Sequence, residues 1–168
     1  MTHTMENQEP ERSVFAPALV LACGNTLRGD DGVAWQIASL LADDPLLQNV
    51  EVILSQQFLP EHSEPLSRAS VVVFIDCSAL TAAGKIAAER VEAATELPRI
   101  MTHHLDPASL LRIALDLYGR IPAQATVVTV GGESFEFGAE LSPVVAASVE
   151  QAANAVREML VQLQVSSI

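Results

Sequence analysis

Acidic and imidazole side chains stand at three places in this 168-residue sequence where they could share a metal ion or activate a water molecule. Asp30 and Asp31 follow one apolar run, Asp76 closes another, and His103 and His104 precede a helix signal. Two carboxylates and one imidazole form an O/O/N ligand set with open positions, which suits a borderline divalent ion such as nickel or zinc. Their order does not match the H-E-x-x-H pattern of zinc proteases.

Most of these side chains also have a purely structural explanation. Acidic residues just before a helix, such as Asp30 and Asp31, stabilise the positive end of the helix dipole. A loop histidine is usually solvated or structural, so only its neighbours favour a ligand role for His104. Asp76 is harder to explain in this way, because a carboxylate that closes an apolar strand is costly to bury unless it is paired or bound to a cation.

The loop that begins at Gly24 and Asn25, GNTLRGDDG, also resembles an anion-binding turn. Glycine turns at helix N-termini bind phosphate. This loop lacks the G-x-G-x-x-G spacing and the P-loop lysine, and its two carboxylates would repel a phosphate group. A small-molecule α/β hydrolase or a nucleotide-binding domain is therefore the weakest of the functions considered.

Short apolar runs alternate with amphipathic segments along the chain. The runs predict buried strands at 18–23, 71–75 and 125–130, and a further strand at 50–54. Helices are expected over 33–42 and 59–69, from the Asp106-Pro107 cap to Gly119, and as one long helix from the Ser142-Pro143 cap to about Leu163. The segment 85–91 fits either a short strand or a helical turn. This alternation predicts a doubly wound α/β sheet with helices on both faces.

Apolar spacing also predicts the inward faces of the last two helices. The residues are Leu110, Leu111, Ala114, Leu115 and Tyr118 in one, and Val145, Val149, Ala152, Val156, Leu160 and Leu163 in the other.

Polar residues collect at the expected carboxyl ends of the strands, where open α/β sheets bind their ligands. They are Gly24-Asn25, Asp30-Asp31, Gln56-Gln57, Asp76 and 131–133. Because these ends meet at one edge of the sheet, the sequence predicts that the two acidic groups converge there.

Composition narrows the class of protein. Nine Lys and Arg against 21 Asp and Glu give a net charge of −12, which disfavours nucleic acid and anionic membranes as partners. Hydrophobic residues make up 49% of the chain, enough for one α/β domain over 16–168, while 1–15 is expected to be a disordered extension. Two cysteines, Cys23 and Cys77, are too few for a disulfide scaffold, and no signal peptide or membrane-spanning run is evident, so a cytoplasmic location is expected.

Four motifs, in order, resemble the hydrogenase maturation proteases, the endopeptidases that remove the C-terminal extension of a nickel-iron hydrogenase large subunit. The motifs are GNTLRGDDGVAW, FIDCSA, THHLDPASLL and VGGESFEFGAELSP, and the resemblance spans about Leu19 to Leu163. It implies a three-layer αβα, phosphorylase/hydrolase-like fold around a twisted, mostly parallel five-stranded sheet, with 85–91 as the one antiparallel strand.

The resemblance also implies a metal-interacting set of Asp31, Asp76 and His104, with the two aspartates as catalytic candidates. A shift of one residue would replace His104 by His103. The supporting loop would contribute Gly24, Asn25, Asp30 and Gly32. The chain departs from the family where Cys23 replaces a usual loop glycine and where Ala34-Trp35 replaces a frequent second glycine, and Trp35 is expected to narrow partner choice.

The leading hypothesis is an endopeptidase that trims the nickel-iron hydrogenase large-subunit precursor after nickel insertion. Nickel carried by the precursor would complete the ligand set of Asp31, Asp76 and His104. Hydrolysis would use either a metal-polarised water with one aspartate as base or the carboxylates alone. The alternative is a non-catalytic nickel-binding or docking module built on the same residues.

Overall fold

The computed structural model describes residues 17–97 and 105–165. The expected extension 1–15 and both candidate histidines, His103 and His104, lie outside these residues. The strands are β1 (Ala18–Cys23), β2 (Val50–Ser55), β3 (Val71–Ser78), β4 (Ile86–Arg90) and β5 (Gln124–Gly131). The helices are α1 (Val33–Ala42), α2 (Ser63–Arg68), α3 (Pro107–Tyr118), α4 (Pro143–Ala146) and α5 (Val149–Val165), with short 3-10 turns at Gly29–Gly32, Pro45–Leu47 and Pro60–His62.

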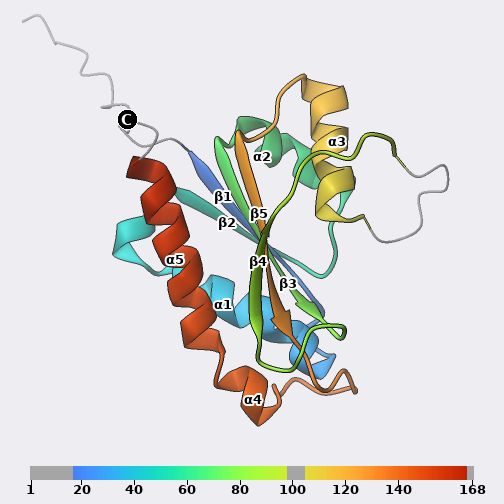
Figure 1. Cartoon of the computed structure of the whole chain (residues 1–168), viewed down its shortest axis with the longest axis vertical. Coiled ribbons are helices and arrows are strands. Elements are labelled where there is room, and N and C mark those ends of the chain that lie inside the picture. Colours follow the sequence, from blue (N-terminus) through green and yellow to red (C-terminus); the bar gives the residue numbers. More distant parts are fainter. Residues whose placement is uncertain (1–16, 98–104, 166–168) are drawn as a thin grey trace, which may run out of the picture.

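The five strands form one sheet in the order β2-β1-β3-β5-β4 (Figure 1). The pairs β1–β2, β1–β3 and β3–β5 are parallel, and β4 pairs antiparallel with β5 at the edge. The mostly parallel sheet and its single antiparallel strand are therefore confirmed. The segment around 85–91 is that strand and not a helical turn.

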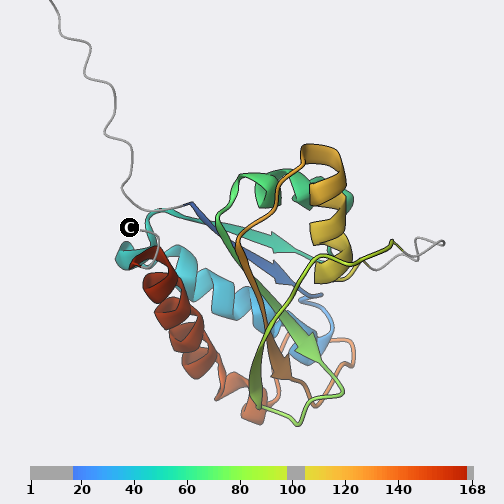
Figure 2. The same ribbon diagram turned by 45° about the horizontal axis from the view of Figure 1, so that its top comes forward.

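Helices cover both faces of the sheet, which makes the three layers visible in Figure 2. Alternate residues of β1 separate the two cores, because successive side chains of a strand point to opposite faces. Val20 packs with Ile37 of α1 and Leu160 of α5. Leu21 belongs to the opposite core, with α2 and α3. Burial on both faces explains why β1 is wholly apolar.

The inward face of α3 differs in part from the predicted one. Leu110, Leu111 and Ala114 are buried as expected. Ile113, which was not predicted to face inward, is also buried, whereas Leu115 is 38% exposed. Tyr118, in the last turn before the Gly119 cap, is 46% exposed. The buried stripe is therefore rotated toward Ile113, a choice that apolar spacing alone does not make.

The predicted long last helix is two helices. Ser142 is the N-cap residue of the first and Pro143 follows it, as predicted, but the Ser142 side chain does not cap the helix. The Ser142 hydroxyl makes no capping hydrogen bond in α4, because it donates to Asp30 Oδ2 at 2.8 Å. The chain then breaks between α4 and α5, where the buried Ser148 hydroxyl donates to the Val145 carbonyl at 2.7 Å. Such back-bonding competes with the helical ladder and bends helices.

Among residues 17–97 and 105–165, no helix combines the length and the apolar character that crossing a membrane requires.

Candidate functional site

A pocket of about 430 Å³ lies at the carboxyl ends of β1, β2 and β3. We call it the acidic pocket. It is lined by Cys23, Gly24, Asp31, Gln56, Gln57, Phe58, Asp76, Cys77 and Leu105. The predicted convergence of polar groups is thus found for Gly24, Asp31, Asp76 and the glutamine pair. The residues 131–133 do not line this pocket.

The sequence indicated that Asp76 ends its strand, but in the structure Asp76 lies within β3. The strand continues to Ser78 because its pairing with β5 continues, with Asp76 opposite Thr129. The Thr129 hydroxyl donates to Asp76 Oδ1 at 2.8 Å, and Oδ2 accepts no hydrogen bond from the described residues. One oxygen of Asp76 is therefore held in place while the other stays available.

The surroundings of Asp76 make its carboxyl a better proton acceptor than an ordinary aspartate. Burial raises its pKa, and the negative charge of Asp31 raises it further, while the hydrogen bond from Thr129 acts in the opposite direction. Sequence reasoning missed Thr129. The signal it left is a hydroxyl residue inside an otherwise apolar strand.

Asp31 reaches the acidic pocket from the 3-10 turn Gly29–Gly32, and the loop before it wraps around its carboxylate. The Asn25 backbone N–H donates to Asp31 Oδ2 at 2.7 Å, and the Asn25 side chain accepts from the Leu27 N–H at 2.9 Å. A Cβ on Gly24 would lie 1.9 Å from the Asp31 carbonyl oxygen, so only glycine fits there. The supporting roles expected of Gly24 and Asn25 thus have a geometric basis.

Asp30 has a different task from its neighbour. Its side chain is fully buried and accepts four hydrogen bonds, from the Glu133, Ser134 and Ser142 N–H groups and the Ser142 hydroxyl, at 2.7–2.9 Å. Burial alone would raise the pKa of Asp30, but these donors outweigh it and hold the pKa below its usual range. Asp30 therefore fastens the loop 25–32 to the loop 132–142 and is neither a helix cap nor a pocket group.

The two cysteines line the acidic pocket from opposite faces of the sheet, Cys23 with the α2 and α3 core and Cys77 with the α1 and α5 core. Burial, followed by the charge of Asp31, raises the pKa of each thiol to about 12. Both remain protonated near neutral pH, and a protonated thiol is a poor nucleophile. The pocket therefore favours carboxylate chemistry over thiolate chemistry.

The described residues contain no group of three His, Cys, Asp or Glu side chains placed to hold a metal ion. Asp31 and Asp76 could offer two carboxylate oxygens to a cation, so a metal site here would need a third ligand from outside the described ranges or from a bound substrate. His62 does not supply it, because its Nδ1 accepts the Leu59 N–H at 3.0 Å within the turn Pro60–His62.

No family model matches the chain, and neither does any of the curated proteins compared with it. Solved structures do match. The hydrogenase maturating endopeptidase HybD from E. coli is 27% identical, with a TM-score of 0.68 over 86% of this chain and 91% of that one. The hydrogenase 2 maturation peptidase from Thaumarchaeota archaeon SCGC_AB-539-E09 is 25% identical, with a TM-score of 0.65 over 86% and 97%. This chain therefore resembles the hydrogenase maturation endopeptidases in fold and in sequence.

The likeness of fold extends to more distant structures. The maturation protease HycI from Thermococcus kodakarensis KOD1 is 20% identical, with a TM-score of 0.66 over 87% of this chain and 93% of that one, a likeness of fold. The three-layer αβα prediction and the family resemblance drawn from the four motifs are both confirmed.

Proposed function

We propose that this chain is an endopeptidase that removes the C-terminal extension of a nickel-iron hydrogenase large-subunit precursor. The observation that carries the proposal is the convergence of Asp31 and Asp76 in one pocket at the carboxyl end of a maturation-protease sheet. Two carboxylates from separate elements, each held by one oxygen, form a preorganised pair suited to activating water or binding a cation.

The two aspartates divide the work according to their surroundings. Asp76, whose pKa is raised by burial, is the general base that takes a proton from the attacking water. Asp31, held by the Asn25 N–H, orients its free oxygen toward the cation carried by the precursor. The neighbouring amides of Gln56 and Gln57 offer uncharged donors for the peptide.

Nickel belongs to the substrate in this proposal. Asp31 and His104 form an incomplete ligand set, which binds a nickel ion only when the precursor supplies the remaining ligands. Recognition of the ion then places the scissile bond beside the two carboxylates, and this positioning accounts for much of the rate enhancement. The net charge of −12 favours the approach of a cation-bearing segment.

The purified chain is expected to shorten a nickel-loaded precursor and to leave the nickel-free precursor intact. Mass spectrometry of the large subunit after incubation, with and without the chain, measures the outcome. Equal cleavage of both forms would remove nickel from recognition. A stable complex with the loaded precursor that never gives a shorter product would establish the non-catalytic docking module instead.

His104→Ala is expected to abolish cleavage of the nickel-loaded precursor, because the ligand set would lose its only nitrogen. His103→Ala, the matched control one residue away, should retain at least half of the wild-type rate, since a side chain outside the ligand set contributes no binding to the ion. Initial rates at saturating precursor distinguish the two variants. The reverse pattern would assign the ligand to His103.

A further inference from the structure

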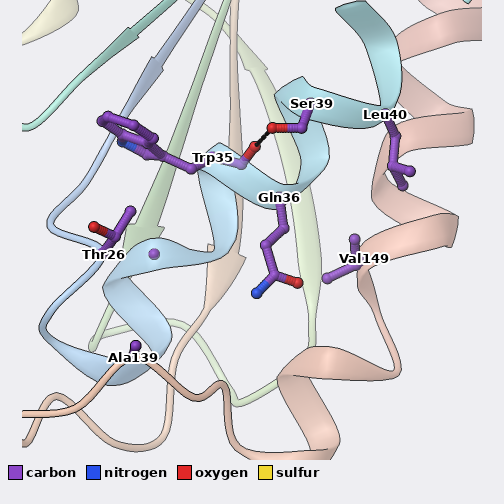
Figure 3. A pocket seen from close by; sticks show the side chains of 8 residues that line it. Thr26, Trp35, Gln36, Ser39, Leu40, Ala139 and Val149 are labelled. Atoms are coloured by element: carbon purple, nitrogen blue, oxygen red, sulfur yellow. Dashed lines mark hydrogen bonds between the residues drawn. The ribbon is translucent and has the colours of Figure 1, made fainter. Parts of the chain in front are cut away.

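A second hollow, which we call the apolar groove, adjoins the loop that carries Asp31. It encloses about 370 Å³ between α1, the loop 25–32, the loop 132–142 and the start of α5. Figure 3 shows the side chains that line it. The residues that matter for the argument are Thr26, Gly32, Trp35, Gln36, Leu40 and Val149. None of the described residues that line it carries a charge, although the chain has 21 acidic residues.

Trp35 joins the apolar groove to the acidic pocket. Its indole N–H donates to the Ser55 carbonyl at 3.2 Å, and the same carbonyl accepts the Gly24 N–H at 3.0 Å. Gly24 lines the acidic pocket, and Gly32 of the groove directly follows Asp31. The two hollows therefore border the same loop, 24–32, although they have no lining residue in common.

The surface next to the apolar groove is apolar as well. Leu40 on α1 is 45% exposed, and Leu27 and Phe137 project from the two neighbouring loops with 51% and 82% exposure. A backbone hydrogen bond connects the two loops, because the Gly138 N–H donates to the Leu27 carbonyl at 2.9 Å. Apolar side chains gathered around a groove are typical of a surface that binds a protein segment.

We infer that the apolar groove is a specificity subsite for an uncharged aliphatic or aromatic side chain of the precursor, within a few residues of the scissile bond. This inference rests on the proposed endopeptidase function. The loop 24–32 carries the inference, because its residues line both hollows in alternation, and an extended segment that crosses this loop advances about 3.3 Å per residue, so its side chains can reach the groove within a few residues of a bond cleaved in the acidic pocket. The uncharged lining selects an apolar side chain, since burying a charge there without a partner is costly.

The test compares steady-state cleavage of the nickel-loaded precursor by the wild-type chain, Leu40→Glu and Gln36→Glu. Both variants place a carboxylate in the groove, and Gln36→Glu does so with almost no change in volume. We expect KM to rise about tenfold or more in each variant while kcat changes less than about threefold. Leu117→Glu, on α3 at a residue that is 67% exposed, is the matched control and should leave KM unchanged.

Changes in the precursor identify the occupant. A lysine at one apolar position beside the scissile bond should raise KM for the wild type and restore cleavage by Leu40→Glu, because the two substitutions then form a charge pair. If the wild-type chain cleaves the precursor and both groove variants have the same KM as the wild type, the subsite is contradicted. A wild-type dimer that Leu40→Glu makes monomeric would also contradict it and would assign the groove to a second copy. A wild-type chain that never cleaves contradicts the proposed function and the subsite with it.

Discussion

Asp76→Asn is expected to lower kcat for precursor cleavage by about 10²–10⁴-fold, the contribution typical of a general base. The amide keeps the shape of the carboxylate and can still accept the Thr129 hydroxyl, which donates to Asp76 Oδ1 at 2.8 Å. What it loses is the ability to take a proton from water. Single-turnover cleavage of the nickel-loaded precursor measures the effect, and retention of more than a tenth of the rate would contradict the role.

The same substitution is expected to leave the fold as stable or to stabilise it. A raised pKa means that the folded state favours the protonated carboxyl, so the stability contributed by Asp76 is complete below its unfolded pKa and is lost as pH rises through the folded value. At neutral pH the ionised group therefore costs free energy, and a neutral amide removes that cost. Thermal unfolding at pH 7 should give a Tm equal to or above that of the wild type.

Thr129 variants provide the companion measurement. Because the Thr129 hydrogen bond lowers the pKa of Asp76, Thr129→Val should raise that pKa, so the acidic limb of the rate profile should move to higher pH. Thr129→Ser keeps the hydroxyl and should restore the wild-type profile. Asp43→Asn, an exposed acidic residue at the end of α1, controls for the loss of one negative charge.

Asp30→Asn is expected to have the largest effect on stability, about 3 kcal/mol, which lowers Tm by on the order of 10 °C. The buried carboxylate accepts four hydrogen bonds, whereas an asparagine offers one oxygen and turns its NH₂ group toward backbone N–H donors. Urea unfolding at pH 7 measures the loss. The loop 25–32 should also loosen, so activity should fall through displacement of Asp31.

Asp31→Asn is the matched control, one residue away and chemically identical. An asparagine oxygen can still accept the single N–H that Asn25 donates, so Tm should change by less than about 2 °C while cleavage is lost. Equal unfolding free energies for Asp30→Asn and the wild type would contradict the structural role of Asp30.

The pH dependence gives a further check on Asp30. Its pKa is lowered in the folded state, so its contribution is present above the unfolded pKa, about 3.9, and is lost as pH falls through the folded value. The difference in unfolding free energy between the wild type and Asp30→Asn should therefore shrink below about pH 4.

Local signals in the sequence determined most of the elements. The wholly apolar run Ala18–Cys23 and the Asp106 cap, which accepts the Ser109 N–H at 2.7 Å, are recognisable because the interactions that define them lie within a few residues. Convergence at the carboxyl edge followed from the rule that parallel strands end together, which brought Asp31 and Asp76 to one pocket.

Only the tertiary structure separated Asp30 from Asp31. The two residues are chemically identical neighbours, and the backbone N–H groups that donate hydrogen bonds to the Asp30 carboxylate lie more than 100 positions away in the chain. The same long-range bond redirected the Ser142 hydroxyl from its expected cap, and pairing with β5 carried β3 past Asp76. The sequence by itself thus determined the elements and the acidic pair, through short-range preferences. The packing of distant loops decided which aspartate is structural and which lines the pocket, because hydrogen-bond partners far apart in sequence leave no local pattern.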